Sequence, residues 1–134
     1  MEIKRLANNT LNFVLKKVIE IIGLTLGIIG LLLLISLITF SPDDPNFIFP
    51  ENTEIKNLLG FQGSFISDLF LQSLGLIAFL IPIGFFLSGI NIILTKKLIL
   101  IIENLFYTIV YSLFGSLFFT FFYPNAFNLY INGN

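Results

Sequence analysis

Residues 40–68 read FSPDDPNFIFPENTEIKNLLGFQGSFISD, and this stretch decides the fold because it is the one long polar segment in an apolar chain. It carries most of the acidic residues. Its three prolines forbid a continuous helix, since each lacks an amide donor and restricts the residue before it. Apolar runs long enough to cross a membrane lie on both sides. The stretch therefore separates two expected membrane spans.

The composition is that of a membrane protein. Of the 134 residues, 56% are hydrophobic and only 11% are charged, which is too little polar surface to coat a soluble globule. A net charge of −1 with 7 Lys and Arg argues against direct contact with nucleic acid. The chain has no Cys, no His and no phosphate-loop or nucleophile motif. We therefore expect no catalytic residue, no cofactor-binding residue, no cofactor and no metal site.

The pattern predicts an all-α, multi-pass bundle of transmembrane helical hairpins with three spans. Basic residues before the first span and at Lys96-Lys97, with acids between them, predict a cytoplasmic N-terminus. The expected segments are a basic cytoplasmic segment (1–17), a first span (18–40), an extracytoplasmic loop (41–66), a second span (67–94), a cytoplasmic turn (95–97), a third span (98–123) and an extracytoplasmic tail (124–134). Residues 1–17 are expected to form a short helix on the membrane surface, or to be the cytoplasmic start of the first span.

Small residues mark helix-packing faces in the first span. Gly23 and Gly27 have G-x-x-x-G spacing, and Gly30 follows one turn later. Such a strip lets another helix approach closely. We expect its partner to be a helix of the same chain rather than a dedicated homodimer seam.

The second span contains Gly75 and Pro82, which we also assign to helix packing. Because Pro82 cannot donate an amide hydrogen bond, we expect a kink near Ala78. In the third span, Glu103 lies only about 9 Å beyond Lys97. It is expected to snorkel, or to pair with a nearby lysine, rather than to relay protons.

The polar stretch itself predicts turns and caps. Residues 41–45 should cap the first span with turns, and residues 46–54 should be extended. Gly60 and Gly63 mark a tight re-entry, after which Ser64, Ser67 or Asp68 would be the N-cap of the second span. The loop acids have no third ligand at a defined spacing, so we interpret them as solvated turn residues and not as a metal site.

Three pieces of sequence, in order, resemble the N-terminal membrane domain of the FtsK/SpoIIIE DNA translocases. They are TFSPDDP (39–45), NLLGFQGSFISDL (57–69) and LGLIAFLIP (74–82). Phe40 and Phe79 stand where that family usually has Tyr, and Ser64 and Ser67 stand where it usually has Ala. The loop residues that carry the resemblance are Ser41, Pro42, Asp43, Pro45, Asn57, Gly60, Gly63 and Asp68.

The resemblance implies a non-catalytic, four-helix anchor in the bacterial inner membrane, at the division septum, that assembles with other cell-division proteins and acts in chromosome partition. It further implies a homo-oligomer, a hexamer in that family, in contact with the lipid bilayer. ATP and Mg²⁺ would belong only to the family's motor domain. That motor and a fourth span are missing from these 134 residues, and we expect the sequence to be a fragment rather than a stand-alone anchor.

Two other functions are compatible with the residues. Glu103 and the Pro82 kink allow a small transporter or channel subunit. An inert structural membrane protein whose outer loop binds a partner is the third possibility.

Overall fold

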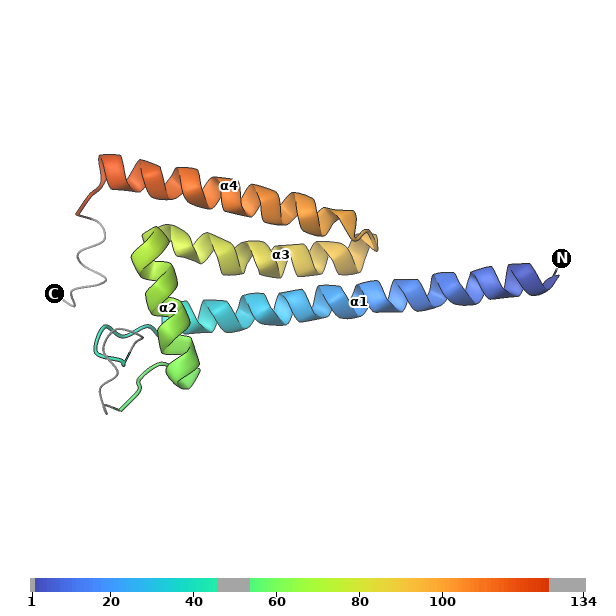
Figure 1. Ribbon diagram of the computed structural model, residues 1–134, viewed down its shortest axis with the longest axis horizontal. Helices are drawn as coiled ribbons and strands as arrows, with labels where there is room; N and C mark the ends of the chain where they lie inside the picture. The colour runs from blue at the N-terminus through green and yellow to red at the C-terminus, as the bar shows by residue number, and fades with distance from the viewer. Residues whose placement is uncertain (1, 46–53, 126–134) are drawn as a thin grey trace.

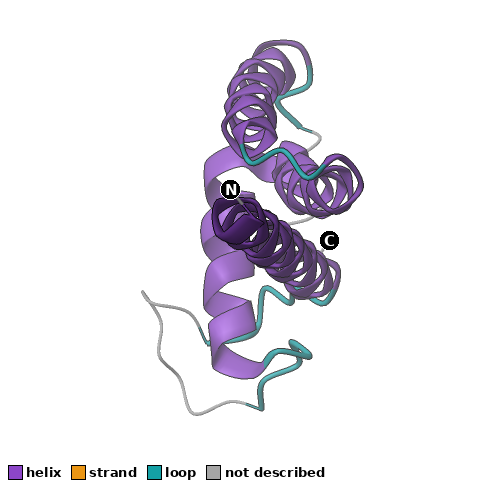
Figure 2. Cartoon of the chain, turned by 90° about the vertical axis from the view of Figure 1, so that its right-hand side faces the viewer, coloured by secondary structure: helices purple, strands orange, loops and turns teal. Residues whose placement is uncertain are grey.

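A computed structural model describes residues 2–45 and 54–125. They form α1 (Glu2–Ile38), α2 (Gly60–Leu74), the short 3-10 helix η1 (Gly75–Phe79), α3 (Leu80–Thr95) and α4 (Ile99–Phe122). Helices α1, α3 and α4 run side by side, and α2 crosses one end of the bundle (Figure 1, Figure 2). The prediction of an all-α fold is confirmed.

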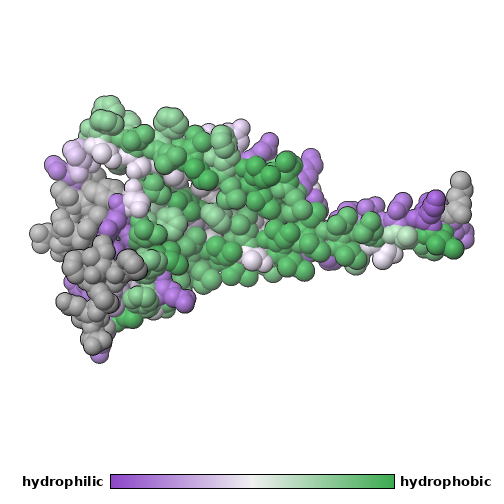
Figure 3. All heavy atoms as spheres, in the orientation of Figure 1, coloured by the Kyte–Doolittle hydropathy of each residue, from purple (hydrophilic) through white to green (hydrophobic). Residues whose placement is uncertain are grey.

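Three helical segments are long and apolar enough to cross a membrane: Glu2–Ile38, Gly60–Thr95 and Ile99–Phe122. Large hydrophobic side chains cover the outside of the bundle (Figure 3). Apolar surface of this extent requires lipid around it, because in water it would drive aggregation. The chain is therefore a multi-pass membrane protein in contact with lipid. The exact membrane boundaries and the side on which the N-terminus lies stay predictions.

Helix α1 is one continuous helix of 37 residues. At 1.5 Å per residue it is about 55 Å long, well beyond the ~30 Å of a hydrocarbon core. Its N-terminal part projects past the other helices (Figure 1). Residues 2–17 therefore continue the first span as a helix and do not form a separate one. Glu20 marks the level of the α3–α4 turn, since its carboxylate bonds Lys17 Nζ at 2.8 Å and Lys96 Nζ at 2.7 Å.

Glycines let α1 and α3 pack almost backbone to backbone. A Cβ added at Gly89 would lie 2.5 Å from the carbonyl oxygen of Gly23 and 2.7 Å from the amide nitrogen of Gly27. One added at Gly30 would lie 2.7 Å from the amide nitrogen of Phe86. A Cβ at Gly27 would meet nothing within 4 Å. The glycine strip of the first span thus faces a helix of the same chain. At Gly27 it is the backbone that contacts Gly89, while the Cβ position of Gly27 itself lies in open space.

The second expected span, residues 67–94, is not one helix. The chain turns at η1, close to the kink expected near Ala78, but the reason differs from the one expected. Gly75 has φ 66°, a conformation that other residues avoid, and it ends α2. Pro82 instead lies in the first turn of α3, where a missing amide donor costs nothing. The corner is filled by Leu37, Leu71 and Ala78.

Helices α3 and α4 form a hairpin through a basic turn in which Lys96 has φ 58°. They approach closely at Gly84, where an added Cβ would lie 2.5 Å from Thr108 Oγ1. Glu103 lies exposed on α4. Among the described residues it pairs with none of Lys16, Lys96 and Lys97, and Lys96 is held by Glu20 instead. Of the two alternatives expected for Glu103, pairing with a lysine is therefore wrong, and snorkelling stays a prediction.

The packing predicts opposite effects for two neighbouring glycine substitutions. Gly89→Ala forces a methyl group into the α1 backbone and should destabilise the bundle by about 1–3 kcal/mol. Gly27→Ala fills open space and should be neutral, or stabilising by up to ~1 kcal/mol through helix propensity. Thermal unfolding in detergent, followed by circular dichroism, measures both. Equal destabilisation by the two variants would contradict this arrangement of α1 and α3.

Candidate functional site

The side chain of Asn57 joins the loop to both flanking helices. It is buried, with 4% of its surface exposed. Its amide nitrogen donates to the Ser36 carbonyl oxygen of α1 at 2.9 Å, and its amide oxygen accepts from the Leu59 amide at 3.0 Å, just before α2. Loss of this side chain would leave the buried Ser36 carbonyl of α1 and the Leu59 amide at the start of α2 without this partner.

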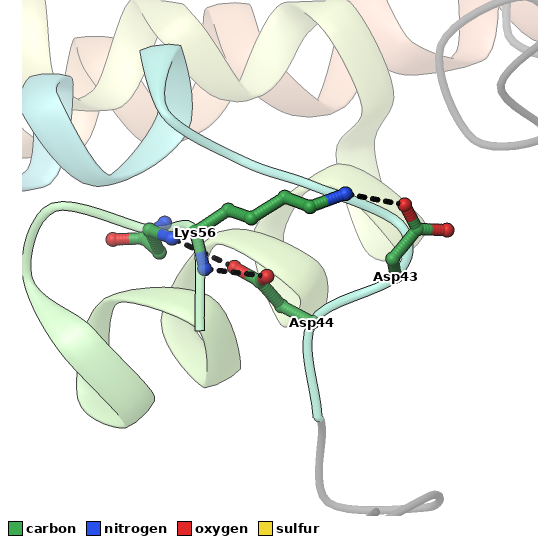
Figure 4. Close-up of polar contacts among 4 residues, drawn as sticks. Asp43, Asp44 and Lys56 are labelled. Atoms are coloured by element: carbon green, nitrogen blue, oxygen red, sulfur yellow. Dashed lines mark hydrogen bonds and ion pairs between the residues drawn. The ribbon is translucent and has the colours of Figure 1, made fainter. Parts of the chain in front are cut away.

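The carboxylate of Asp44 is also buried, at 5% exposure. Its two oxygens accept from the backbone amides of Lys56 and Asn57, both at 2.8 Å (Figure 4). These charge-assisted bonds replace water around the carboxylate and clamp the two ends of the loop together. The prediction that the loop acids are solvated is therefore wrong for Asp44.

The adjacent acid, Asp43, is exposed. Its carboxylate accepts from Lys56 Nζ at 2.7 Å, and this contact raises the pKa of Lys56 above its usual value (Figure 4). An exposed pair of this kind contributes little to stability because solvent screens it. Of the two acids, Asp44 is the structural one.

Two serines complete the cluster. Ser36 Oγ donates to the Gly63 carbonyl oxygen at 2.7 Å, and Ser64 Oγ donates to the Pro45 carbonyl oxygen at 3.0 Å. A Cβ on Gly63 would overlap the amide oxygen of Asn57, so only glycine fits there. We call this buried cluster, made of Ser36, Asp44, Asn57, Gly63 and Ser64, the loop cap.

The structure moves the start of the following helix. Helix α2 begins at Gly60, which has φ 67° and whose amide donates to the Asn57 carbonyl oxygen at 2.9 Å. The N-cap prediction is wrong, because the three candidates, Ser64, Ser67 and Asp68, all lie inside α2. Leu59 stands at that position and makes no side-chain cap bond, because Asn57 supplies the acceptor two residues earlier. The positive φ of Gly60 lets the chain turn into α2 at this residue, earlier than predicted.

The remaining motif residues have separate places. The predicted turn after the first span is present, since the Asp44 amide donates to the Ser41 carbonyl oxygen at 3.2 Å. Pro42 is exposed. Asp68 lies outside the loop cap and accepts from Gln72 at 2.8 Å. Residues 46–53, which include Glu51 and all but the last residue of the segment predicted to be extended, lie outside the described residues, as do the tail residues 126–134.

The loop cap holds the loop and its two flanking helices together through internal hydrogen bonds. It contains carboxylate, amide and hydroxyl groups that are already bonded to one another. Within residues 2–45 and 54–125, no group of three or more His, Cys, Asp or Glu could hold a metal ion. These bonds fix the orientation of α2 relative to α1, and they therefore determine which surface the loop presents.

Three residues of the site were not predicted from the sequence: Ser36, Thr39 and Lys56. Thr39 Oγ1 accepts from the Leu58 amide at 3.2 Å, so it ties the residue just after α1 to the loop, whereas Ser36 Oγ bonds α2 directly. The available signal was a polar residue near the end of an apolar span, because such a residue needs a hydrogen-bond partner there.

The two loop acids should differ sharply when substituted. Asp44→Ala leaves the buried amide of Asn57 and the partly buried amide of Lys56 without their acceptor, and should cost about 1–3 kcal/mol, mainly through Asn57. Asp43→Ala removes only an exposed ion pair and should cost less than ~1 kcal/mol. Amide hydrogen exchange of a peptide covering residues 54–60 measures the local opening, which should accelerate in the first variant and hardly change in the second. Similar exchange in both would show that Asp44 does not hold the loop.

Comparisons with known proteins show which family the chain belongs to. Residues 16–133 match the family described as the 4TM region of DNA translocase FtsK/SpoIIIE. The chain is 42% identical over 66 residues to a protein of Rickettsia bellii named DNA translocase FtsK, a match that covers 49% of this chain and 9% of the relative. It is 33% identical over 87 residues to a protein of the same name from Azospirillum brasilense, covering 63% of this chain and 14% of the relative.

The matches thus span about a tenth of the length of these relatives. No solved structure matches the chain. The family match extends over most of the chain and includes the loop cap, α1 from residue 16 onward and both later apolar segments. The chain therefore belongs to the FtsK/SpoIIIE DNA translocase family, and it comprises the membrane region of that family.

Proposed function

We propose that this chain is the membrane anchor and assembly module of a DNA translocase that acts in cell division and chromosome segregation, and that it is itself non-catalytic. The observation that carries the proposal is the family match over residues 16–133. The relatives are named DNA translocases, and a membrane region of such a protein would hold its motor at the membrane. The loop cap supports the proposal because a fixed loop can present one constant surface to partner proteins.

The proposed location is the bacterial inner membrane at the division septum, with the N-terminus in the cytoplasm. The charge distribution supports this orientation. Lys16 and Lys17 of α1 lie at the same end of the bundle as the Lys96-Lys97 turn, as the ion pairs of Glu20 indicate. Clusters of basic residues are retained on the cytoplasmic side of inner membranes.

The proposed partners are other cell-division membrane proteins and further copies of the same chain, six in all if the assembly follows the family resemblance. Loop residues Pro42 and Asp43 are exposed beside the loop cap and are available for contact. The bundle leaves most of α4 uncovered, because only 6% of the apolar stretch of this helix is buried. Both surfaces are consistent with assembly.

A fluorescent protein fused to the N-terminus should collect at the septum of dividing cells. Asn57→Ala opens the loop cap and should reduce the ratio of septal to lateral fluorescence several-fold. Gln72→Ala, an exposed change on α2 outside the cap, should leave that ratio unchanged. Even fluorescence around the whole membrane throughout division would contradict the septal role.

The orientation can be tested with single cysteines, because the natural sequence has none. Lys56→Cys should react in intact spheroplasts with a maleimide that cannot cross membranes. Lys4→Cys and Lys97→Cys should react only after the membrane is permeabilised. The reverse pattern would show that the N-terminus is outside, while leaving the fold unaffected.

A further inference from the structure

An uncharged polar groove runs between α3 and α4. Its volume is about 380 Å³, and it is lined by Gly84, Leu87, Ser88, Asn91, Asn104, Tyr107, Thr108 and Tyr111. The close contact between Gly84 and Thr108 joins the two helices at the groove. At 1.5 Å per residue, the lining residues of α4, from Asn104 to Tyr111, span about 10 Å, and they begin about 8 Å from the start of α4 at the basic turn. Polar side chains therefore face the region where lipid tails would lie.

Most hydrogen-bonding side chains of the groove are left unsatisfied. In the part of the chain that the structure describes, the side-chain amides of Asn91 and Asn104 and the hydroxyl of Tyr107 have no hydrogen-bond partner. Ser88 is only 2% exposed and likewise unbonded. One turn beyond Thr108, Ser112 Oγ is buried without a hydrogen bond. In hydrocarbon each such group costs free energy unless another polar group meets it, so the groove calls for a partner.

We propose that the α3–α4 groove is the surface through which copies of this chain associate in the membrane. An amide is both donor and acceptor, so a strip of amides and hydroxyls can satisfy an identical strip. Two copies with the same orientation carry these strips at the same depth in the bilayer. Hydrogen bonds between Asn side chains of neighbouring helices stabilise such associations.

A lipid headgroup fits the groove less well. Bacterial headgroups carry a phosphate, which requires a cation, and none of the residues that line the groove is charged. The lysine at the nearby turn, Lys96, is already bonded to Glu20. A different membrane helix carrying polar side chains is the other possible occupant, and the experiment below distinguishes it from a second copy.

The inference rests on the proposed self-assembly of the anchor and names its interface. Single-cysteine variants of the full chain, oxidised in native membranes, test it directly. Tyr107→Cys and Tyr111→Cys should form disulfide-linked dimers. Ile102→Cys and Ile109→Cys lie at similar depths but on another face of α4, are also exposed, and should remain monomeric. Dimers from the control face, equal dimers from both faces, or no dimers from any of the four variants would overturn the proposal.

A second measurement tests the hydrogen bonds. Asn91→Leu combined with Asn104→Leu removes no side-chain bond within the described structure, so the fold should persist. Energy transfer between labelled copies should show association about tenfold weaker, as expected for the loss of two interhelical hydrogen bonds. Thr25→Val, which removes an exposed hydroxyl on α1, is the matched control. Unchanged association in the double variant would overturn the role of the groove.

Septal fluorescence of the parent chain, recorded in the same cells, separates this inference from the proposed function. If the chain reaches the septum and its copies transfer energy, but cross-links form only on the control face, the groove assignment alone fails. If the chain never collects at the septum, the anchor role fails whatever the cross-links show.

Discussion

The fold depends on one requirement, which is that polar backbone at the end of a membrane helix must find hydrogen-bond partners within the protein. After α1, the chain leaves the apolar bundle through residues that no regular structure can satisfy. Asn57 and Asp44 supply the missing donors and acceptors, and each does so from a buried position. Because these bonds are short and internal, the direction of α2 is set by side chains of the loop and not by the helix itself.

Glycine performs the corresponding task inside the bundle. Without a hydrophobic driving force between helices in lipid, packing depends on close approach of the backbones. Gly23 and Gly89 permit that approach between α1 and α3, and Gly84 permits it between α3 and α4. At the corner, Gly75 allows the chain to turn from α2, which crosses the end of the bundle, toward α3 (Figure 1). Glycines thus fix the helix spacing, and the loop cap fixes the connection between the first two helices.

Much of this architecture could be predicted from the sequence, because long apolar runs and basic turns have few alternative meanings. The three spans, the turn at Ser41 and the break near Ala78 belong to that part. The burial of Asp44 could not be predicted, since its neighbour Asp43 has the same side chain and is exposed. Only the three-dimensional arrangement reveals that the amides of Lys56 and Asn57 face one acid and not the other. The start of α2 at Gly60 was missed for a related reason, because its acceptor comes from Asn57, three residues before the helix begins.

The two polar regions of the chain differ in a way that separates folding from assembly. In the loop cap, nearly every polar side chain is bonded within the same chain, so the cap stabilises a single copy. In the α3–α4 groove, most of the amide and hydroxyl side chains stand unbonded in the part of the chain that the structure describes. A buried or lipid-facing polar group that contributes nothing to its own fold is a cost in a single chain. That cost disappears if the same groups are satisfied by a neighbouring copy, which gives a physical reason for a monomeric bundle to carry an uncharged polar strip at membrane depth.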